Sequence, residues 1–298
     1  MEIIIGKTAG FCFGVKNAVT KAEEALKQNE EIYCLGELVH NKQVTKKLTQ
    51  KGMHFIDDIT EAKAKTVIRS HGVEKNIYKQ AENMEIELID LTCPKVLNIH
   101  NIAEEYAQKG FYIILTGDKN HPEMLGTASF CGEHYYILEK EEDIENAIDE
   151  FKKLKLSNIL LISQTTYSLE KFKKIADILQ KEIPNIEVIN TICNATKMRQ
   201  EETEQMAKDV DIMIIVGGKH SSNSNKLYEI AKKHCNNVLF VETADELNIK
   251  REFIGGKNHE NKPSVRIGIM AGASTPEESI VKVVEKLKEM WYNKKGKI

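Results

Sequence analysis

Residues 86–96, IELIDLTCPKV, read as an apolar strand that enters a short loop with a cysteine and then continues as a helix. Two other stretches follow the same order, IIIGKTAGFCFGV at residues 3–15 and IEVINTICNAT at residues 186–196. A strand, a polar loop and a helix in this order are the building block of parallel sheets. The cysteines of the three stretches are Cys12, Cys93 and Cys193.

Short apolar runs alternate with charged segments of helical period along the rest of the chain, which predicts an α/β fold. The three cysteines lie 81 and 100 residues apart, which favours three small αβ lobes over one large sheet. We expect parallel-rich sheets, arranged around a central cluster site. The predicted lobes are residues 1–95 with the Cys12 and Cys93 loops, residues 96–193 ending at the Cys193 loop, and residues 194–298, against which residues 1–12 could also pack.

The composition excludes several classes of partner. The chain of 298 residues has 42 lysines and arginines against 45 aspartates and glutamates, a net charge of −3, so we expect no nucleic acid partner. Apolar runs such as Ile212–Val216 are far shorter than the ~20 residues that cross a bilayer, and the N-terminus begins as a strand instead of a signal peptide. We therefore expect a cytoplasmic protein without a membrane partner, whose six cysteines stay reduced.

Polar side chains gather after the predicted strands, at the edge where open α/β sheets bind ligands. Each has a structural explanation on its own, because loop histidines often lie at the surface and serine or asparagine before a helix caps its amide groups. The segments SSNSN and AGASTPEES suit such capping well. Together, these side chains predict a ligand site. They are His40, His71, His121, Glu123, Thr165, Ser221, Ser222, Asn223 and Ser274.

Three cysteine loops of similar pattern could supply three thiolates to one metal centre, which leaves zinc and an iron–sulfur cluster as candidates. Structural zinc usually has four ligands with a local CxxC pair, and the sequence contains no CxxC. A [4Fe–4S] cluster with three cysteines would leave one iron open to a substrate oxygen. The remaining cysteines are expected to be core residues. They are Cys34, Cys131 and Cys235.

The serine-rich and glycine-rich turns that open two predicted helices offer backbone amide groups to an anion. The segment GGKHSSNSN lacks the GK[ST] ending of an ATP-binding loop, and no GxGxxG follows a strand. A small organic phosphate therefore fits better than ATP or a dinucleotide. His40 and His71 could donate hydrogen bonds to its phosphate oxygens.

Nine short motifs occur in an order that resembles the LytB family of 4-hydroxy-3-methylbut-2-enyl diphosphate reductases. They are GFCFGV, LVHN, SHGV, TCP, HPE, QTT, ICNAT, SSNSN and AGAS, spread over nearly the whole chain. The resemblance implies a three-lobed α/β enzyme with one [4Fe–4S] cluster per chain, held by Cys12, Cys93 and Cys193 with one open iron. It implies reductive removal of the hydroxyl group from an allylic diphosphate, which yields isopentenyl and dimethylallyl diphosphate in the non-mevalonate isoprenoid pathway.

The resemblance also implies a role for each candidate side chain. Glu123 would be the proton donor, with Thr165 beside it in a hydrogen-bond relay, and His121 would help to bind the substrate. Burial and a nearby diphosphate would raise the pKa of this glutamate toward neutrality. Electrons would come from ferredoxin or flavodoxin, because no nicotinamide or flavin motif is present. The implied diphosphate ligands are His40, His71, Ser221, Ser222, Asn223 and Ser274.

Three alternatives stay open at this level. A hydratase-type enzyme could use the same open iron on a small organic phosphate without net electron transfer. A zinc enzyme could use the same three thiolates. A phosphate-binding module without catalysis would need the cysteines only for its core.

Overall fold

The computed structural model divides into two compact units. Unit 1 contains residues 1–13, 40–44 and 194–298, and unit 2 contains residues 14–39 and 45–193. Three four-stranded sheets, called A, B and C here, have only parallel neighbours within the described part of the chain, so the predicted α/β class with parallel sheets is confirmed. The predicted lobe boundaries at residues 95 and 193 stay a prediction. The structure describes residues 1–28, 31–154, 158–183, 185–249 and 265–295.

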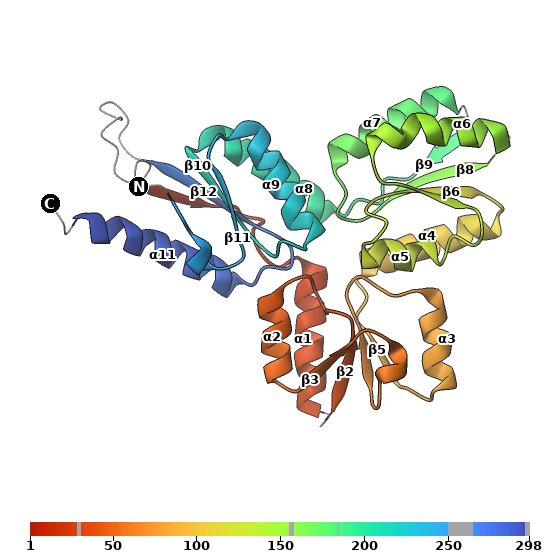
Figure 1. The fold of residues 1–298 in the computed structure, drawn as a ribbon, viewed down its shortest axis with the longest axis horizontal. Coiled ribbons are helices and arrows are strands. Elements are labelled where there is room, and N and C mark those ends of the chain that lie inside the picture. The colour runs from red at the N-terminus through yellow and green to blue at the C-terminus, as the bar shows by residue number, and fades with distance from the viewer. Residues whose placement is uncertain (29–30, 155–157, 184, 250–264, 296–298) are drawn as a thin grey trace. The chain divides into compact units, whose positions relative to one another are not determined.

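Sheet A lies in unit 1 and has the strand order β1-β12-β10-β11. Strand β10 is IMIIV and buried throughout, because helices cover both faces of the sheet (Figure 1). Its strands are β1 (Glu2–Ile5), β12 (Arg266–Ala271), β10 (Ile212–Val216) and β11 (Val238–Val241). Residues of α8 (Asn194–Asp209) and α9 (Ser222–His234) pack in one core cluster, and residues of α11 (Glu277–Lys295) pack in another.

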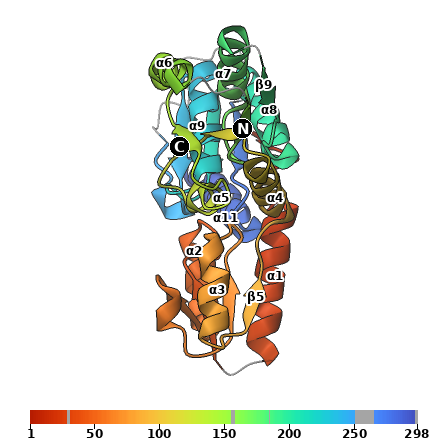
Figure 2. The same ribbon diagram turned by 90° about the vertical axis from the view of Figure 1, so that its right-hand side faces the viewer.

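Sheet B lies in unit 2 and has the order β3-β2-β4-β5. Figures 1 and 2 show α1 and α3 on opposite sides of this sheet. The strands are β2 (Ile32–Leu35), β3 (Met53–Ile56), β4 (Thr66–Ile68) and β5 (Leu88–Asp90). The helices are α1 (Phe13–Gln28), α2 (Lys42–Gln50) and α3 (Lys75–Asn83).

Sheet C also lies in unit 2 and has the order β7-β6-β8-β9. One core cluster joins it to α6 and α7, and a second cluster joins it to α4 and α5. The strands are β6 (Tyr112–Thr116), β7 (Tyr135–Leu138), β8 (Ile159–Ser163) and β9 (Ile186–Val188). The helices are α4 (Pro94–Gln108), α5 (Pro122–Ala128), α6 (Ile144–Leu154) and α7 (Leu169–Glu182).

The clearest differences from the sequence-based expectation concern strands β3 and β9. Strand β3 was not expected, because its four residues MHFI include an exposed histidine and form an edge strand without a long apolar run. The apolar pattern of residues 187–192 predicts a strand up to Ile192, but β9 ends at Val188. The Thr191 hydroxyl accepts from the Ser163 amide at 2.8 Å and donates to the Ser163 carbonyl at 2.5 Å, so a side chain takes over the pairing.

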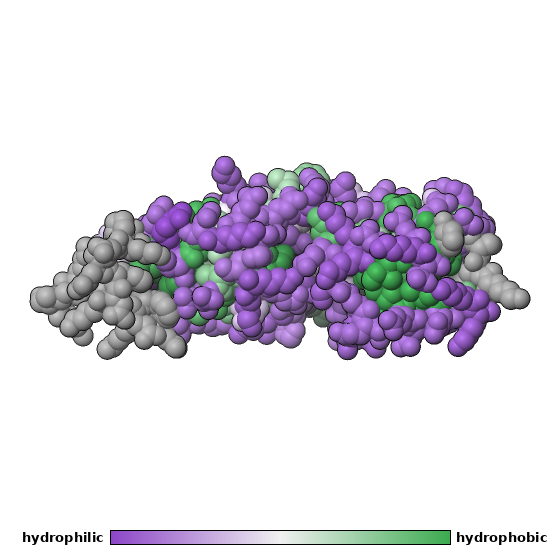
Figure 3. Space-filling view, turned by 90° about the horizontal axis from the view of Figure 1, so that it is seen from above, coloured by the Kyte–Doolittle hydropathy of each residue, from purple (hydrophilic) through white to green (hydrophobic). Residues whose placement is uncertain are grey.

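The surface is largely hydrophilic where Figure 3 shows it, with smaller hydrophobic areas between charged side chains. Aspartate, glutamate, lysine and arginine make up 29% of the sequence, which accounts for this character. Among the described residues, no helix is both long and apolar enough to cross a membrane.

Candidate active site

The carboxyl ends of the adjacent strands β6 and β8 bring Glu123 and Thr165 together in unit 2. Glu123 lies in the first turn of α5, which follows β6, and Thr165 lies just after β8. The Thr165 backbone amide donates to Oε1 of Glu123 at 2.6 Å, and the Thr165 hydroxyl lies 2.6 Å from Oε2. The second contact can work in both directions, because a protonated carboxyl group can itself donate to the hydroxyl oxygen.

Glu123 is only 1% exposed, and burial raises its pKa to about 7 although the two hydrogen bonds from Thr165 oppose this rise. The expected rise toward neutrality is therefore present. A carboxyl group with such a pKa exists in both protonation states near neutral pH, which is the property that a general acid requires.

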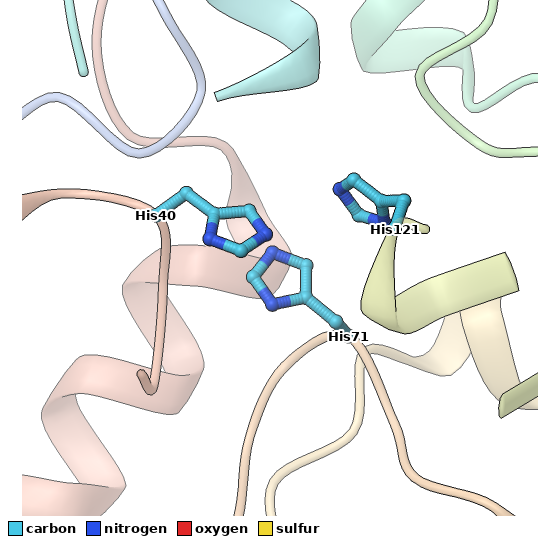
Figure 4. A group of neighbouring side chains, drawn as sticks. All are labelled: His40, His71 and His121. Carbon is cyan, nitrogen blue, oxygen red and sulfur yellow. The ribbon is translucent and has the colours of Figure 1, made fainter. Parts of the chain in front are cut away.

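His121 and His71 of unit 2 lie close to each other (Figure 4). His121 is the N-cap of α5, and its Nδ1 accepts from the Glu123 backbone amide at 3.1 Å. The neutral ring therefore carries its proton on Nε2, where it can donate to a ligand. His71, in the loop after β4, packs edge-to-face against His121 with ring centroids 5.4 Å apart. The two imidazole rings, one from the loop after β4 of sheet B and one from the start of α5 beside sheet C, are therefore in contact.

Cys93 and Cys193 are half-buried in unit 2, and the backbone amide of each donates to a loop that carries another predicted site residue. The Cys193 amide donates to the Thr165 carbonyl at 3.0 Å, and the Cys93 amide donates to the Ser70 carbonyl, one residue before His71, at 3.0 Å. Cys93 is the N-cap of α4. A Cβ atom on Gly14 would lie 2.6 Å from the Cys93 sulfur, so only glycine leaves this thiol its space.

The remaining candidates lie in unit 1, where they surround the start of α9 and the loop before α11. Ser221 is the N-cap of α9, as its Oγ accepts from the Ser224 amide at 3.3 Å, so the capping explanation holds for this residue. Asn223 is 3% exposed, yet its side-chain amide has no hydrogen-bond partner among the described residues. Such a buried orphan is costly unless a ligand pairs with it.

His40 and Ser274 come together in unit 1 through a hydrogen bond from the Ser274 hydroxyl to the His40 carbonyl at 3.0 Å. Ser222 is the first residue of α9, beside Asn223. Cys12 precedes α1 and donates its amide to the carbonyl of Ala273, the neighbour of Ser274, at 3.1 Å. Unit 1 therefore collects hydroxyl, amide and imidazole groups with one thiol.

The division into units separates the predicted site residues into two groups. Unit 2 brings together His71, His121, Glu123 and Thr165 with Cys93 and Cys193, and unit 1 brings together His40, Ser274 and the start of α9 with Cys12. Cys34 and Cys131 are buried, and burial raises the pKa of each thiol to about 12. Cys235 is buried at the end of α9. These three sit as core residues.

Sequence reasoning missed Gln164, Arg199 and Glu202. Gln164 is buried after β8 and accepts from the Asp118 amide at 3.2 Å. Arg199 and Glu202 lie on α8 and bind the loop that carries Cys12. The QTT motif contains Gln164 and offered a signal for it. The two α8 residues stand in a strongly charged segment, where no local pattern marks them.

The fold and the sequence have counterparts among known proteins. Residues 3–288 match the model of the LytB protein family, so this chain belongs to the LytB family. The family inferred from the nine motifs is confirmed.

The relatives carry one enzyme name, 4-hydroxy-3-methylbut-2-enyl diphosphate reductase. The protein of this name from Caldanaerobacter subterraneus is 41% identical over 97% of this chain and 98% of its own length. The one from Aquifex aeolicus is 38% identical over 97% of each chain. The predicted enzyme class, a reductase, is therefore confirmed, and the hydratase alternative is not favoured.

Two solved structures agree with this assignment. One is described as (E)-4-hydroxy-3-methyl-but-2-enyl diphosphate reductase, the terminal enzyme of the non-mevalonate pathway, and is 38% identical with a TM-score of 0.68, over 97% of this chain and 100% of its own. The other is the E-1-hydroxy-2-methyl-but-2-enyl-4-diphosphate reductase of Plasmodium falciparum, 29% identical with a TM-score of 0.83, over 95% and 87% of the two chains.

Proposed function

We propose that this chain removes the 4-hydroxyl group of (E)-4-hydroxy-3-methylbut-2-enyl diphosphate with two electrons and two protons, which yields isopentenyl diphosphate, dimethylallyl diphosphate and water. The names of the near-full-length relatives support the substrate. The structural observation that carries the proposal is Glu123, a buried carboxyl group with a pKa of about 7 whose partner Thr165 also accepts from the Cys193 amide. A titratable proton donor that is linked through Thr165 to the backbone of a proposed cluster ligand suits this reaction.

The proposed cofactor is one [4Fe–4S] cluster per chain, held by Cys12, Cys93 and Cys193. The donor set fits: all three thiols are half-buried and lie outside any disulfide bond, and each stands directly before a helix, whose N-terminal partial charge attracts an anionic thiolate. When bound, this group would supply electron transfer and Lewis-acid chemistry at the substrate hydroxyl. Because Cys12 belongs to unit 1, the proposal requires both units to contribute ligands.

The diphosphate is proposed to bind to neutral hydrogen-bond donors. The unpartnered amide of Asn223 and the backbone amides at the start of α9 are suited to phosphate oxygens. The imidazole rings add donors that can become charged as the anion approaches. The full proposed set is His40, His71, Ser221, Ser222, Asn223 and Ser274.

Proton delivery is proposed to use Glu123 directly. The protonated carboxyl group would donate to the leaving hydroxyl oxygen, so that water leaves instead of hydroxide. Thr165 holds the carboxyl group through two contacts and fixes its direction. His121, whose Nδ1 is already engaged by the Glu123 amide, would use Nε2–H to orient the substrate.

The decisive experiment is anaerobic purification with iron and sulfide assays, followed by turnover of the substrate with an artificial reductant. The proposal expects about four irons and four sulfides per chain, consumption of two electrons per substrate, and both isoprenoid diphosphates as products. Turnover without reductant would support the hydratase-type reaction, and stoichiometric zinc without iron would support the zinc enzyme. A colourless chain that only binds the diphosphate would be a binding module.

The physiological electron donor is proposed to be ferredoxin or flavodoxin, and the location cytoplasmic. The absence of a disulfide bond among the six cysteines, all of which are described, agrees with a reducing compartment. Reduction of the loaded enzyme by each purified carrier, with product formation as readout, tests the donor.

A further inference from the structure

The loop of residues 6–12, which joins β1 to α1, is held on two sides within unit 1. On one side it continues the pairing of β1 with β12, and the Cys12 amide donates to the Ala273 carbonyl at 3.1 Å. On the other side the backbone leaves this pairing at Lys7 and Thr8 and turns toward α8. This second side is where the loop meets Glu202.

Glu202 receives three hydrogen bonds from the loop. The Lys7 amide donates to Oε1 at 2.6 Å, the Thr8 amide donates to Oε2 at 2.9 Å, and the Thr8 hydroxyl donates to Oε2 at 2.5 Å. Burial raises the pKa of this carboxyl group, but the bonds from Thr8 and Lys7 outweigh burial and keep the pKa below its usual value. The group is thus a carboxylate at neutral pH, and its bonds are charge-assisted.

Arg199, one turn earlier on α8, also binds the loop of residues 6–12. Its side chain is buried, its Nη2 donates to the Gly10 carbonyl at 2.6 Å, and its Nη1 donates to the Ala195 carbonyl of its own helix at 2.9 Å. Gly10 has a φ of 95°, a left-handed conformation that other residues rarely adopt. The turn two residues before Cys12 is therefore fixed by α8.

The other acidic residues of this stretch behave differently. Glu201 is exposed and pairs with Lys197 on its own helix at 3.9 Å, and Glu204 pairs with Lys208 at 2.6 Å. Glu202 instead reaches a segment 194 residues away in the sequence. Helix α8 begins at Asn194, directly after Cys193, which is one proposed cluster ligand. The same helix binds the loop that carries Cys12, a second proposed ligand.

We propose that Glu202 is a positioning residue for Cys12: its carboxylate, with Arg199, fixes the loop so that the Cys12 thiol is presented to the cluster before assembly and is retained afterwards. This inference rests on the proposed role of Cys12. Its chemistry needs no contact between Glu202 and the cluster, because the carboxylate acts on the loop amides alone.

The test compares Glu202→Gln, Thr8→Val and the double variant with the matched control Glu201→Gln, all as full-length loaded enzyme. Loss of one charge-assisted bond predicts that cluster absorbance decays about 10-fold faster under a chelator in Glu202→Gln and in Thr8→Val. The double variant should decay no faster than the worse single variant, because both changes remove the same contact. Glu201→Gln should match the parent.

A second readout needs no cluster. In the cluster-free chain, alkylation of Cys12 measured by mass spectrometry should speed up about 10-fold in Glu202→Gln, while alkylation of Cys93 in the same molecules should not change. If Glu202→Gln shows both the decay and the Cys12 alkylation of Glu201→Gln, the inference is overturned. A parent chain that takes up no cluster would refute the proposed function, and the alkylation ratio would still decide the role of Glu202.

Discussion

The two units carry different chemistry in the side chains predicted for the site. Unit 2 contributes titratable groups, with Glu123 buried beside Thr165 and two imidazole rings in contact. Unit 1 contributes mainly hydroxyl and amide groups around the start of α9, among them the unpartnered Asn223. Proton transfer needs a group whose pKa is near the working pH, and anion binding needs only donors that stay in place. The proposed function therefore assigns proton transfer to unit 2 and anion binding mainly to unit 1, with His71 of unit 2 as one further donor to the anion.

The largest expected effect concerns the thiols, which are the one feature that both units are proposed to share. Serine at Cys12, Cys93 or Cys193 should abolish cluster iron, because a hydroxyl is a poor ligand for the cluster. Iron and sulfide per chain after anaerobic purification provide the measurement. Serine at Cys131 or Cys235 should leave the iron content unchanged. Full iron in the Cys12 variant would remove unit 1 from the cluster.

The next largest effect tests the proposed proton donor of unit 2, Glu123. Glu123→Gln keeps the size of the side chain but lacks the transferable proton, and general acid catalysis is worth about 10²–10⁴ in rate. The variant should carry its cluster and bind substrate, yet turn over at least about 100-fold more slowly at saturating reductant. Glu133→Gln, an exposed change in the same lobe, is the control. Turnover within a few-fold of the parent would mean that another group donates the proton.

The same carboxyl group should make unit 2 sensitive to pH. Its pKa is about 7 when folded against 4.5 as the reference value, so the folded chain keeps a proton that the unfolded chain releases between these values. The stabilising contribution is therefore complete below pH 4.5 and is lost as the pH rises to about 7, by about 3 kcal/mol. Chemical unfolding of the cluster-free parent and Glu123→Gln between pH 4.5 and 8 should show this difference. Parallel profiles for the two chains would contradict the raised pKa.

The smallest expected effect compares the two units as ligands of the same anion. His71→Ala in unit 2 and Asn223→Ala in unit 1 each remove one hydrogen bond to a charged group, worth about 1.5–3 kcal/mol or about 10- to 150-fold in affinity. Calorimetric titration with the substrate, at an unchanged cluster spectrum, measures this. A loss in only one of the two variants would assign the diphosphate to a single unit.

The central strands were predictable from the sequence, because a strand that is buried on both faces consists of consecutive apolar residues. The apolar run of residues 32–35 predicts a strand with these bounds, and the central strand β2 (Ile32–Leu35), buried throughout, has them. The end of β9 could not be predicted, because the Thr191 hydroxyl replaces backbone pairing there. Such a substitution depends on a neighbouring strand and leaves no local pattern.

The site residues were predictable where they follow neighbouring parallel strands, because the carboxyl ends of such strands lie at the same edge of the sheet. Glu123 and Thr165 meet because β6 and β8 are neighbours and their carboxyl ends share one edge. Glu202 could not be found in this way, since it stands in mid-helix among charged residues that resemble a solvated face. Only the folded chain reveals that its carboxylate faces a loop instead of water. The assignment of residues to two units is likewise a property of the fold.

The pairing of β1 with β12 has a consequence for biosynthesis. Ile3 lies opposite Ile267, so the first strand finds its partner 264 residues later in the chain. At translation rates of about 5–20 residues per second, β1 waits roughly 13–53 s for β12 to be made. Sheets B and C can form on the ribosome meanwhile, because their strands lie within residues 32–188. The Cys12 loop therefore takes its final form only after residues 266–271 have been made, and the proposed binding of a cluster at Cys12 is expected to follow that step.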